Sequence, residues 1–315
     1  MKVEVCYGKI INRIYFFGKG ESRMQKTAVK AYAKINLHLD VLGIADNGYH
    51  MVNTVMQTVS LCDDVEVSLN DIGVHSIECN IAGIPKDSKN LAWRAADMFF
   101  EKTGLSYGAD INIIKRIPAA AGLAGGSADA AAVFIALNEL CGKPLSEDEL
   151  CVISARLGAD VPFCIAGGAK FADRFGDVLH PFFDLPDCYV VVTCGREGVS
   201  TPWAYAKLDE TYSGFAEGAY TPRDLSLLKG ALANKDILGV CKNMYNIFEG
   251  VIEKERAEVV MLRGVMLDSG ALGSMMSGSG PSVFGIFDDE SKAKAARSAI
   301  EATGLKAFLC KPVSR

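Results

Sequence analysis

Three glycines, Gly122, Gly125 and Gly126, lie within five residues and stand directly ahead of Ser127. Glycine lets the backbone turn tightly and brings main-chain N–H groups close to a ligand without Cβ obstruction. Residues 127–140 are rich in strong helix formers. The first turn of a helix leaves N–H groups unpaired and carries about half a positive elementary charge, so a glycine turn there favours an anion. The arrangement therefore predicts a phosphate site.

Two common nucleotide-binding motifs do not fit this first glycine loop, residues 118–126. It lacks the Gly-Lys-Ser/Thr of a P-loop and the G-x-G-x-x-G spacing of a dinucleotide-binding turn. A lone pair of glycines ahead of a helix is more often a matter of packing. The third glycine and the serine at the helix start favour a ligand site instead.

Polar side chains alternate with apolar ones along residues 31–42. Lys34, Asn36, His38 and Asp40 share one face, and the residues between them are apolar. This period of two predicts a strand whose polar face meets either water or a site. The pattern alone favours a half-solvated sheet.

A tight hairpin turn is predicted at Asp46-Asn47-Gly48, with residues 51–59 returning as a second strand. Tyr49 and His50 lie at the mouth of this turn. An aromatic ring beside an imidazole can stack on a flat base and hydrogen-bond its edge. The same pair can also simply close the edge of a sheet.

Asp160 is a third candidate, between Gly158 and Pro162. The glycine suits the end of a helix predicted over 146–157, and the residue before a proline favours extended geometry. We therefore expect Asp160 on a rigid corner, as a cap or as a functional carboxylate.

A second glycine-rich stretch, residues 275–284, contains Gly278 and Ser279 and enters a predicted strand. Residues 200–205 open a helix that carries Thr201 and Tyr205. Neither stretch indicates a site by itself, because such a glycine loop is a simple turn as readily as a ligand contact.

Together these stretches resemble the GHMP kinase superfamily, from about Met24 to the C-terminus. Residues 118–126 resemble its P-x-x-x-G-L-x-[GS]-[GS] motif, which wraps the phosphates of ATP. Its other motifs resemble three further stretches: A-K-I-N-L at 33–37, G-A-D-V-P at 158–162 and residues 275–284. G-Y-H at 48–50 resembles the diphosphocytidyl kinases within it, in which the tyrosine stacks on cytosine and the histidine reads its polar edge.

The resemblance implies an ATP-dependent kinase that phosphorylates the 2-hydroxyl of 4-diphosphocytidyl-2-C-methyl-D-erythritol, a small-molecule substrate. It implies that Asp160 orients and deprotonates the acceptor hydroxyl, and that Lys34 steadies Asp160 and the transferring phosphoryl group. Implied ATP contacts are Asn90, Lys115, Pro118, Ala119, Ala120, Ala121, Gly122, Leu123, Ala124, Gly125, Gly126, Ser127 and Ala128. Implied substrate contacts are Asn36, Tyr49, His50, Thr201, Tyr205, Gly278 and Ser279. Mg²⁺ is expected with ATP, and Ser127 is one candidate ligand.

Two departures from the family pattern stand out. Ala119, Ala121 and Ala124 occupy positions where relatives often have glycine, which stiffens the loop but still permits N–H donation. Ahead of Gly48 the usual basic residue is replaced by Ile44-Ala45, which removes a positive charge near the expected substrate pocket.

The resemblance also implies the fold, an α+β architecture in two lobes. We expect a ribosomal protein S5 domain 2-like N-terminal domain over 24–180 and a ferredoxin-like C-terminal domain over 181–315. Further helices are expected at 90–103, 223–238, 249–269 and 289–303, further strands at 64–69, 76–81, 109–115, 166–174, 188–194 and 308–311, and a mobile loop at 211–220. Residues 1–23 precede the resemblance, and we interpret them as the product of a start codon assigned too early. Lys19-Gly20-Glu21 can be encoded by a ribosome-binding sequence ahead of Met24.

Composition limits the partners. The chain has 315 residues, a net charge of −5 and a pI near 5.5. It therefore has no basic excess of the kind that drives binding to nucleic acid or membrane surfaces. Its ten cysteines include no C-x-x-C pair and several lie in apolar runs, so we expect buried thiols in a reducing cytoplasm. No obligate protein partner is evident.

Three other functions fit these residues less well. A mevalonate-type or homoserine-type kinase would keep the first glycine loop and Asp160 but would have no use for Tyr49 and His50. A catalytically silent sensor on the same fold would usually lose Lys34 or Asp160. An RNA-binding module is disfavoured by the acidic balance.

Overall fold

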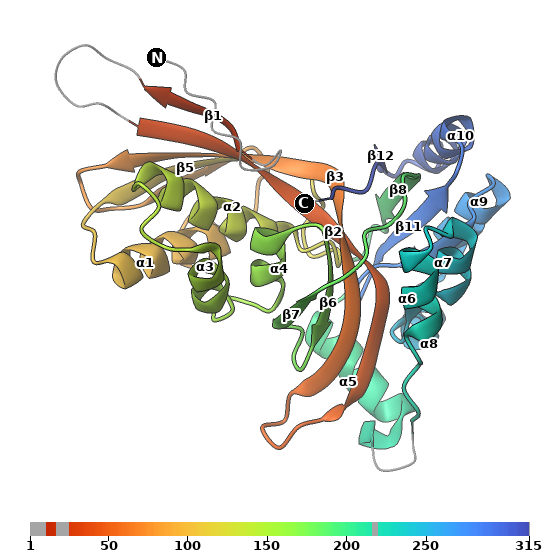
Figure 1. Ribbon diagram of the computed structural model, residues 1–315. Helices are drawn as coiled ribbons and strands as arrows, with labels where there is room; N and C mark the ends of the chain where they lie inside the picture. The colour runs from red at the N-terminus through yellow and green to blue at the C-terminus, as the bar shows by residue number, and fades with distance from the viewer. Residues whose placement is uncertain (1–10, 17–24, 216–219, 315) are drawn as a thin grey trace.

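The computed structural model describes residues 11–16, 25–215 and 220–314. Two sheets, each with its own helices, form two lobes (Figure 1). Over these described ranges the first sheet has eight strands: β1 (Ile11–Phe16), β2 (Gln25–Ile44), β3 (His50–Asn70), β4 (Ser76–Cys79), β5 (Gly108–Ile114), β6 (Ala169–Asp173), β7 (Val178–Pro181) and β9 (Tyr245–Asn246). Its main path runs β1-β2-β3-β5-β4.

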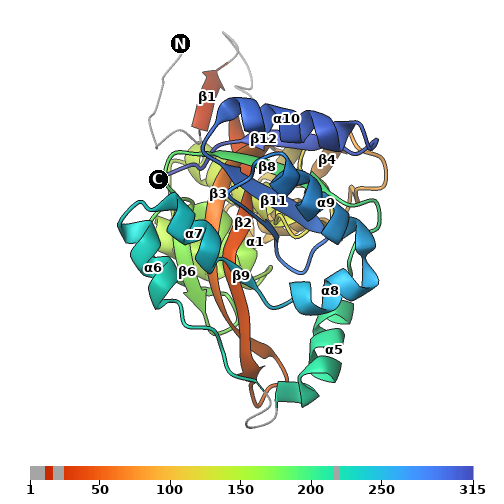
Figure 2. The ribbon, with the colours of Figure 1, turned by 90° about the vertical axis from the view of Figure 1, so that its right-hand side faces the viewer.

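The long antiparallel hairpin of β2 and β3 is the spine of the molecule. The chain reverses at the predicted turn, where Gly48 takes a φ of +80°. The apolar face of β2 packs into the core of the first lobe, with Ala33, Ile35 and Leu37 fully buried. The hairpin extends past both lobes toward α5 (Thr201–Thr211) (Figures 1 and 2). The predicted strand at 31–42 is thus confirmed in a longer form.

Within the described residues, four helices lie on one side of the first sheet: α1 (Leu91–Thr103), α2 (Gly125–Leu140), α3 (Glu147–Ser154) and α4 (Asp160–Ala166). Their starts follow local rules. The Asn90 side chain accepts from the N–H of Ala92 and caps α1, and Ser146 with Glu149 forms a capping box on α3. Helix α2 is the central one, contacting β2, β3, α1 and α4, and its many alanines allow close packing.

The second sheet is antiparallel and ordered β10-β11-β8-β12: β10 (Gly273–Met276), β11 (Ser282–Phe287), β8 (Tyr189–Cys194) and β12 (Ala307–Cys310). Helices α9 (Ala257–Asp268) and α10 (Glu290–Glu301) connect these strands in a β-α-β-β-α-β sequence. This is the predicted ferredoxin-like arrangement. Val191 of β8 faces α9 and α10, while Val190 and Val192 join the core that contains α6 (Ser226–Ala233) and α7 (Ile237–Asn243).

Main-chain hydrogen bonds join the lobes at several places. The N–H of Ser60 in β3 donates to the carbonyl of Lys311 at 2.8 Å, and that of Val313 donates to Thr58 at 2.9 Å. Strand β9 pairs in parallel with β2 although it belongs to the C-terminal half. The domain boundary at residue 180 stays a prediction.

Three sequence expectations were wrong in detail. The helix expected over 223–238 is two helices, because Lys235 takes a left-handed φ of +57° and Asp236 caps α7. The helix expected over 249–269 breaks at Arg256 into α8 (Glu249–Glu255) and α9. Extended geometry before Pro162 was also wrong: this residue lies in the first turn of α4, where proline needs no backbone donor.

Two further expectations fall partly outside the described residues. In the expected loop at 211–220, residues 213–215 form a 3₁₀ turn, η1 (Ser213–Phe215), and 216–219 are outside the description. Of the proposed extension 1–23, only Ile11–Phe16 is described, as β1 paired with β2.

Candidate active site

The two glycine loops, far apart in sequence, meet at the junction of the lobes. The second glycine loop, residues 277–281, donates from Ser277 Oγ to the carbonyl of Gly122 at 3.0 Å. The N–H of Ser282 donates to the carbonyl of Ala121 at 3.3 Å. A Cβ on Gly122 would lie 2.2 Å from the carbonyl oxygen of Ser277, and Gly122 has a φ of +75°. Only glycine fits this contact.

The first glycine loop ends in an uncapped helix start. Ala124, the N-cap of α2, has a left-handed φ of 58° and makes no side-chain capping bond. The first-turn N–H groups of α2 therefore remain available, with the positive end of the helix dipole, to an anion. Ala120 is also left-handed, at φ 50°. The loop thus takes glycine-like conformations with alanine at two positions.

A buried ion cluster supports this loop from beneath. Lys115 Nζ donates to Asp63 Oδ2 at 2.6 Å and to Asp129 Oδ2 at 2.7 Å. Burial lowers the pKa of Lys115, but the two carboxylates outweigh it and raise the pKa above its usual value. Burial raises the pKa of Asp129 to about 7. Asp63 Oδ1 also accepts from the N–H of Ile117 at 2.8 Å, which fixes the chain just ahead of the loop.

Lys34 and Asp160 converge beside the loops. Lys34 Nζ lies 3.9 Å from Asp160 Oδ2 and donates to Asn36 Oδ1 at 2.7 Å. Asn36 Oδ1 also accepts from the N–H of Gly278 at 2.9 Å, while its Nδ2 donates to Thr54 Oγ1 at 2.8 Å. The Asn36 amide therefore fixes Lys34 relative to the second glycine loop. Asp160 is the first residue of α4, and its side chain is 38% exposed whereas that of Lys34 is 4% exposed.

A cavity of about 350 Å³ connects these groups. Its polar end has Lys34, Asp160 and the residues of the glycine loops, and its other end is aromatic. The lining residues are Lys34, Asn36, Leu39, Val52, Thr54, Met56, Gly122, Ser127, Gly158, Ala159, Asp160, Phe175, Gly176, Thr201, Tyr205, Phe248, Gly278 and Ser279.

Aromatic rings of both lobes meet at the second end. The rings of Tyr205 and His50 lie 4.4 Å apart between centroids, and Tyr205 meets Phe248 edge-on at 5.0 Å. Burial raises the pKa of Tyr205 to about 12. His50 Nε2 is 2.7 Å from Asp209 Oδ1, so the carboxylate orients the imidazole.

Tyr49 lies further out and is 68% exposed. Its ring meets Phe175, which lines the cavity, edge-on at 5.9 Å. The exposed ring is therefore free to contact a bound molecule from the open side.

The polar face of β2 is buried, unlike the half-solvated sheet that the alternation alone favours. Beyond Lys34 and Asn36, His38 and Asp40 contact residues of the C-terminal half. Asp40 accepts from Tyr220 Oη at 2.6 Å and from the N–H of Arg223 at 2.8 Å. Burial, aided by Arg223, lowers the pKa of His38 to about 4, so its imidazole is neutral.

The candidate residues named from sequence divide into three groups. Lys34, Asn36, Gly122, Ser127, Asp160, Thr201, Tyr205, Gly278 and Ser279 line the cavity. The remainder of residues 118–128 belongs to the same loop and helix start as Gly122 and Ser127, and Tyr49 and His50 meet lining residues through ring contacts. Asn90 and Lys115 are engaged internally, although a Cβ on Gly126 would lie 3.7 Å from Leu91, which places the start of α1 beside the loop.

Sequence reasoning missed Asp63, Asp129, Asp209, Phe175 and Phe248. The carboxylate of Asp63 reaches Lys115 across 52 positions of sequence, and Asp209 reaches His50 across 159. Only the fold brings such pairs together. Asp129 did carry a signal, since it is the one charged side chain within the alanine-rich start of α2.

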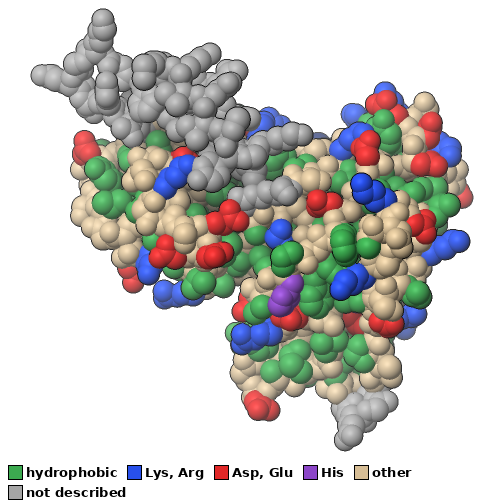
Figure 3. Space-filling model, in the orientation of Figure 1, with side chains coloured by type: hydrophobic (Ala, Val, Ile, Leu, Met, Phe, Trp, Pro, Cys, Tyr) green, Lys and Arg blue, Asp and Glu red, His purple; other side chains and the backbone are tan. Residues whose placement is uncertain are grey.

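Neither charge dominates the face of the molecule drawn in Figure 3. On the face in Figure 3, acidic and basic side chains are interspersed over both lobes. Among the described helices, none combines the length and the apolar character needed to cross a membrane. The nine described cysteines are free thiols, and no group of three metal-binding His, Cys, Asp or Glu side chains occurs within the described ranges.

Comparison with known proteins agrees with this architecture. The family profile "GHMP kinases N terminal domain" matches residues 90–168, and "GHMP kinases C terminal" matches residues 228–306. A 4-diphosphocytidyl-2-C-methyl-D-erythritol kinase of Clostridium novyi is 42% identical over 265 residues, covering 84% of this chain and 92% of the relative. The enzyme of the same name from Acetivibrio thermocellus is 40% identical over 292 residues, covering 92% and 100%. A crystal structure of 4-(cytidine 5′-diphospho)-2C-methyl-D-erythritol kinase superposes with a TM-score of 0.75 at 30% identity, covering 91% and 100%.

A two-lobed fold with paired glycine loops at its junction is that of a GHMP kinase, an ATP-dependent small-molecule kinase. Within that superfamily the chain belongs to the 4-diphosphocytidyl-2-C-methyl-D-erythritol kinase family.

Proposed function

We propose that this enzyme transfers the γ-phosphoryl group of ATP to the 2-hydroxyl of 4-diphosphocytidyl-2-C-methyl-D-erythritol, a step in non-mevalonate isoprenoid precursor synthesis. The observation that carries the proposal is the 3.9 Å approach of Lys34 Nζ to Asp160 Oδ2 in a cavity that also includes Gly122 and Ser127. The proposed base Asp160, the cation Lys34 and the anion-binding start of α2 then surround the polar end of the cavity.

The first glycine loop and the start of α2 are suited to the ATP phosphates. Phosphoryl transfer depends mainly on positioning and charge stabilisation. The unpaired N–H groups of α2 supply fixed donors, and the contact between Gly122 and Ser277 fixes their position. Asn90 and Lys115 remain proposed ATP contacts. Both adjoin the first glycine loop, and their proposed effect on ATP is to fix the shape of that loop.

Asp160 is the proposed general base. Its carboxylate takes the proton of the acceptor hydroxyl as the hydroxyl oxygen bonds to the γ-phosphorus and the bond to the β-phosphate oxygen breaks. Lys34 is nearly fully buried, so its positive charge acts in a low-dielectric setting on Asp160 and the transferring group. Asn36 holds the ammonium in place.

The aromatic end of the cavity suits the cytosine base. Tyr205 and the exposed Tyr49 supply faces for stacking, and the imidazole of His50 is oriented by Asp209. Thr201 Oγ1 and Ser279 Oγ lie 3.0 Å apart and provide polar contacts between the two ends.

Arg174 can supply the positive charge that Ile44-Ala45 lacks. Its guanidinium carbon lies 5.9 Å from the ring centroid of Phe175, a cavity residue. Its carbonyl accepts from the N–H of Val52 at 2.7 Å, which anchors this exposed residue to β3. An arginine there suits the diphosphate of the substrate.

Mg²⁺ fits the donor set as an ion held largely by phosphates. Magnesium commonly keeps several waters and binds one or two carboxylates together with substrate phosphates. Ser127, which lines the cavity, is the proposed protein ligand. When bound, the ion would neutralise phosphate charge. A cytoplasmic location and the absence of a protein or nucleic-acid partner stay predictions of the sequence.

A coupled ATPase assay with a panel of acceptors tests the proposal. The cytidylyl substrate should be preferred over mevalonate and homoserine by a factor on the order of 10⁴ in kcat/KM, since a site built to hydrogen-bond a base rejects ligands that lack it. A matched His50→Leu variant should lose part of this preference and keep its KM for ATP. Comparable use of homoserine or mevalonate would overturn the assignment of substrate.

A further inference from the structure

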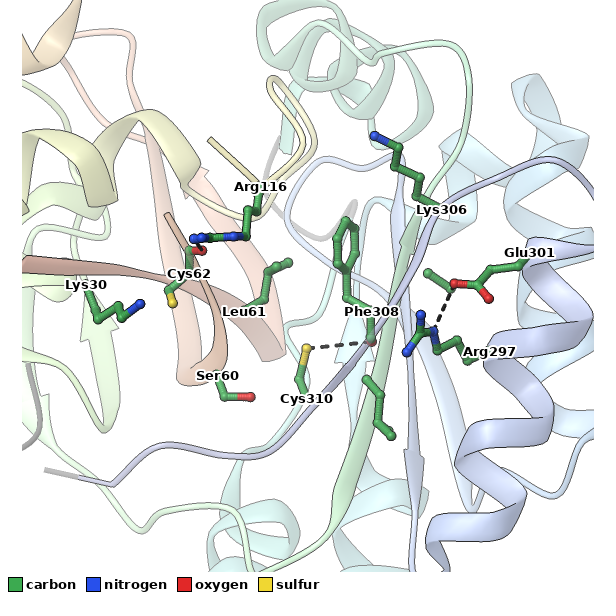
Figure 4. Close-up of a pocket in the computed structure, with 12 residues that line it drawn as sticks. Lys30, Ser60, Leu61, Cys62, Arg116, Arg297, Glu301, Lys306, Phe308 and Cys310 are labelled. Atoms are coloured by element: carbon green, nitrogen blue, oxygen red, sulfur yellow. Dashed lines mark hydrogen bonds and ion pairs between the residues drawn. The ribbon is translucent and has the colours of Figure 1, made fainter. Parts of the chain in front are cut away.

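A second cavity, of about 470 Å³, lies between the lobes and shares no lining residue with the active site (Figure 4). β2, β3 and the segment after β5 line one side, and α10 and β12 line the other. The lining residues are Lys30, Ser60, Leu61, Cys62, Arg116, Arg297, Glu301, Lys306, Ala307, Phe308, Leu309 and Cys310. Its volume is in the range of small-molecule sites.

The cavity is basic although the chain as a whole is acidic. Four cationic side chains line it, Lys30 and Arg116 from the first lobe and Arg297 and Lys306 from the second. Asp64 pairs with both first-lobe cations, and Glu301 pairs with Arg297 at 2.9 Å. Four cations against these two carboxylates leave an excess of two positive charges.

Lys306 carries part of that excess. Within the described ranges it has no carboxylate at ion-pair distance, and it is exposed. The Arg116 and Arg297 side chains are 45% and 47% exposed, so their guanidinium groups remain accessible beside their acidic partners. Between the cations, Leu61 and Phe308 provide an apolar floor (Figure 4).

We propose that this cavity binds a small phosphorylated molecule. Guanidinium groups match phosphate oxygens in geometry and charge, and the apolar floor suits a short carbon skeleton. Arg116 comes from the first lobe and Arg297 from the second, so a ligand that fills the cavity would contact both lobes. The site is distinct from the ATP and acceptor sites and extends the function proposed above.

The position of Arg116 gives the site a route to the active centre. Arg116 precedes Pro118, the start of the first glycine loop, by two residues. The N–H of the intervening Ile117 is held by Asp63, which also binds Lys115 under the loop. A ligand on Arg116 therefore biases the segment that positions the ATP phosphates, and we expect it to change the KM for ATP.

Calorimetric titration with pyrophosphate tests the site on the full chain, with the active site saturated by a non-hydrolysable ATP analogue and the acceptor. Pyrophosphate should still bind, and Lys306→Gln or Arg297→Gln should each weaken binding by about tenfold, as expected for loss of one charge-assisted contact. Lys294→Gln is the matched control, because Lys294 lies on the same helix, pairs with Glu290 and does not line the cavity. Arg297→Lys, which keeps the charge, should bind better than Arg297→Gln.

The readout does not depend on turnover. Asp160→Asn, which should abolish most transfer, should bind pyrophosphate at this site as the wild type does. Absence of binding to the saturated enzyme, or equal binding by the cavity variants and Lys294→Gln, would overturn the proposal. Displacement of pyrophosphate by chloride alone at equal ionic strength would overturn it too, since it would show a site without phosphate selectivity.

Discussion

Replacing Asp129 by asparagine should remove a pH dependence of stability that originates in the buried cluster under the first glycine loop. Asp129 Oδ2 accepts from Lys115 Nζ, while its Oδ1 is buried without a hydrogen-bond partner among the described residues. Burial raises the pKa of Asp129 from 3.8 to about 7; Lys115 opposes the rise and Asp63 adds to it. An asparagine oxygen can still accept from Lys115.

The sign follows from proton binding. Between pH 3.8 and 7 the folded state holds a proton on Asp129 that the unfolded state has lost, so stability falls as the pH rises through this window. With a folded pKa of about 7, the ionisation of this group removes roughly 1.4 kcal/mol of stability between pH 6 and pH 8. For a chain of 315 residues that corresponds to a change of about 2 °C in Tm.

Scanning calorimetry of the wild type and of Asp129→Asn at pH 6, 7 and 8 measures this difference. From pH 6 to pH 8 the Tm of the variant, relative to that of the wild type, should rise by that amount. Asp148→Asn, an exposed replacement on α3, is the control and should follow the wild type. Parallel wild-type and Asp129→Asn curves would refute the reasoning, because they would mean that Lys115 keeps Asp129 ionised throughout.

Three further predictions concern the loops and the substrate pocket. Gly122→Ala should destabilise the protein by at least ~1 kcal/mol more than Gly142→Ala, because both glycines have positive φ but only Gly122 lacks room for a Cβ; thermal unfolding measures it. Asp209→Asn should raise the KM for the acceptor about tenfold, because Asp209 orients the imidazole of His50, and should leave the KM for ATP unchanged. Glu210→Gln, at the next position, is the control and should change neither constant. Arg174→Gln should raise the acceptor KM by about tenfold as well, if the guanidinium holds the diphosphate; steady-state kinetics measures both.

Specific results would contradict these three predictions. Equal losses for the two glycine variants would mean that the loops do not meet as described. A change in the ATP constant alone for Asp209→Asn would place that carboxylate outside the acceptor site. Unchanged kinetics for Arg174→Gln would leave the missing charge at Ile44-Ala45 without a substitute.

The sequence predicted those features that short-range chemistry determines. The helix after Gly125, the capping box at Ser146 and the hairpin at Gly48 follow from residue types a few positions apart, and the structure has all three. The extended geometry predicted before Pro162 is absent, because a proline in the first turn of a helix needs no backbone donor. The break between α8 and α9 at Arg256 could not be predicted, because no glycine or proline lies beside it.

The residues that surround the site could not be predicted from residue patterns in the sequence. The polar face of β2 predicted a half-solvated sheet, and only the second lobe turns it into a buried network around Asp40. The acidic partners of Lys115 and His50 come from segments that the fold alone brings near. Family resemblance supplied the roles of Lys34 and Asp160, and the coordinates supply their proximity.

The most direct test is a single-turnover measurement of phosphoryl transfer from γ-labelled ATP to 4-diphosphocytidyl-2-C-methyl-D-erythritol by Asp160→Asn. Loss of a general base typically lowers the rate by ~10² to 10⁴, and ATP affinity measured by calorimetry should stay within a few-fold of the wild type. A transfer rate equal to that of the wild type would contradict the assignment of Asp160 as the base and, with it, the proposed chemistry of this site.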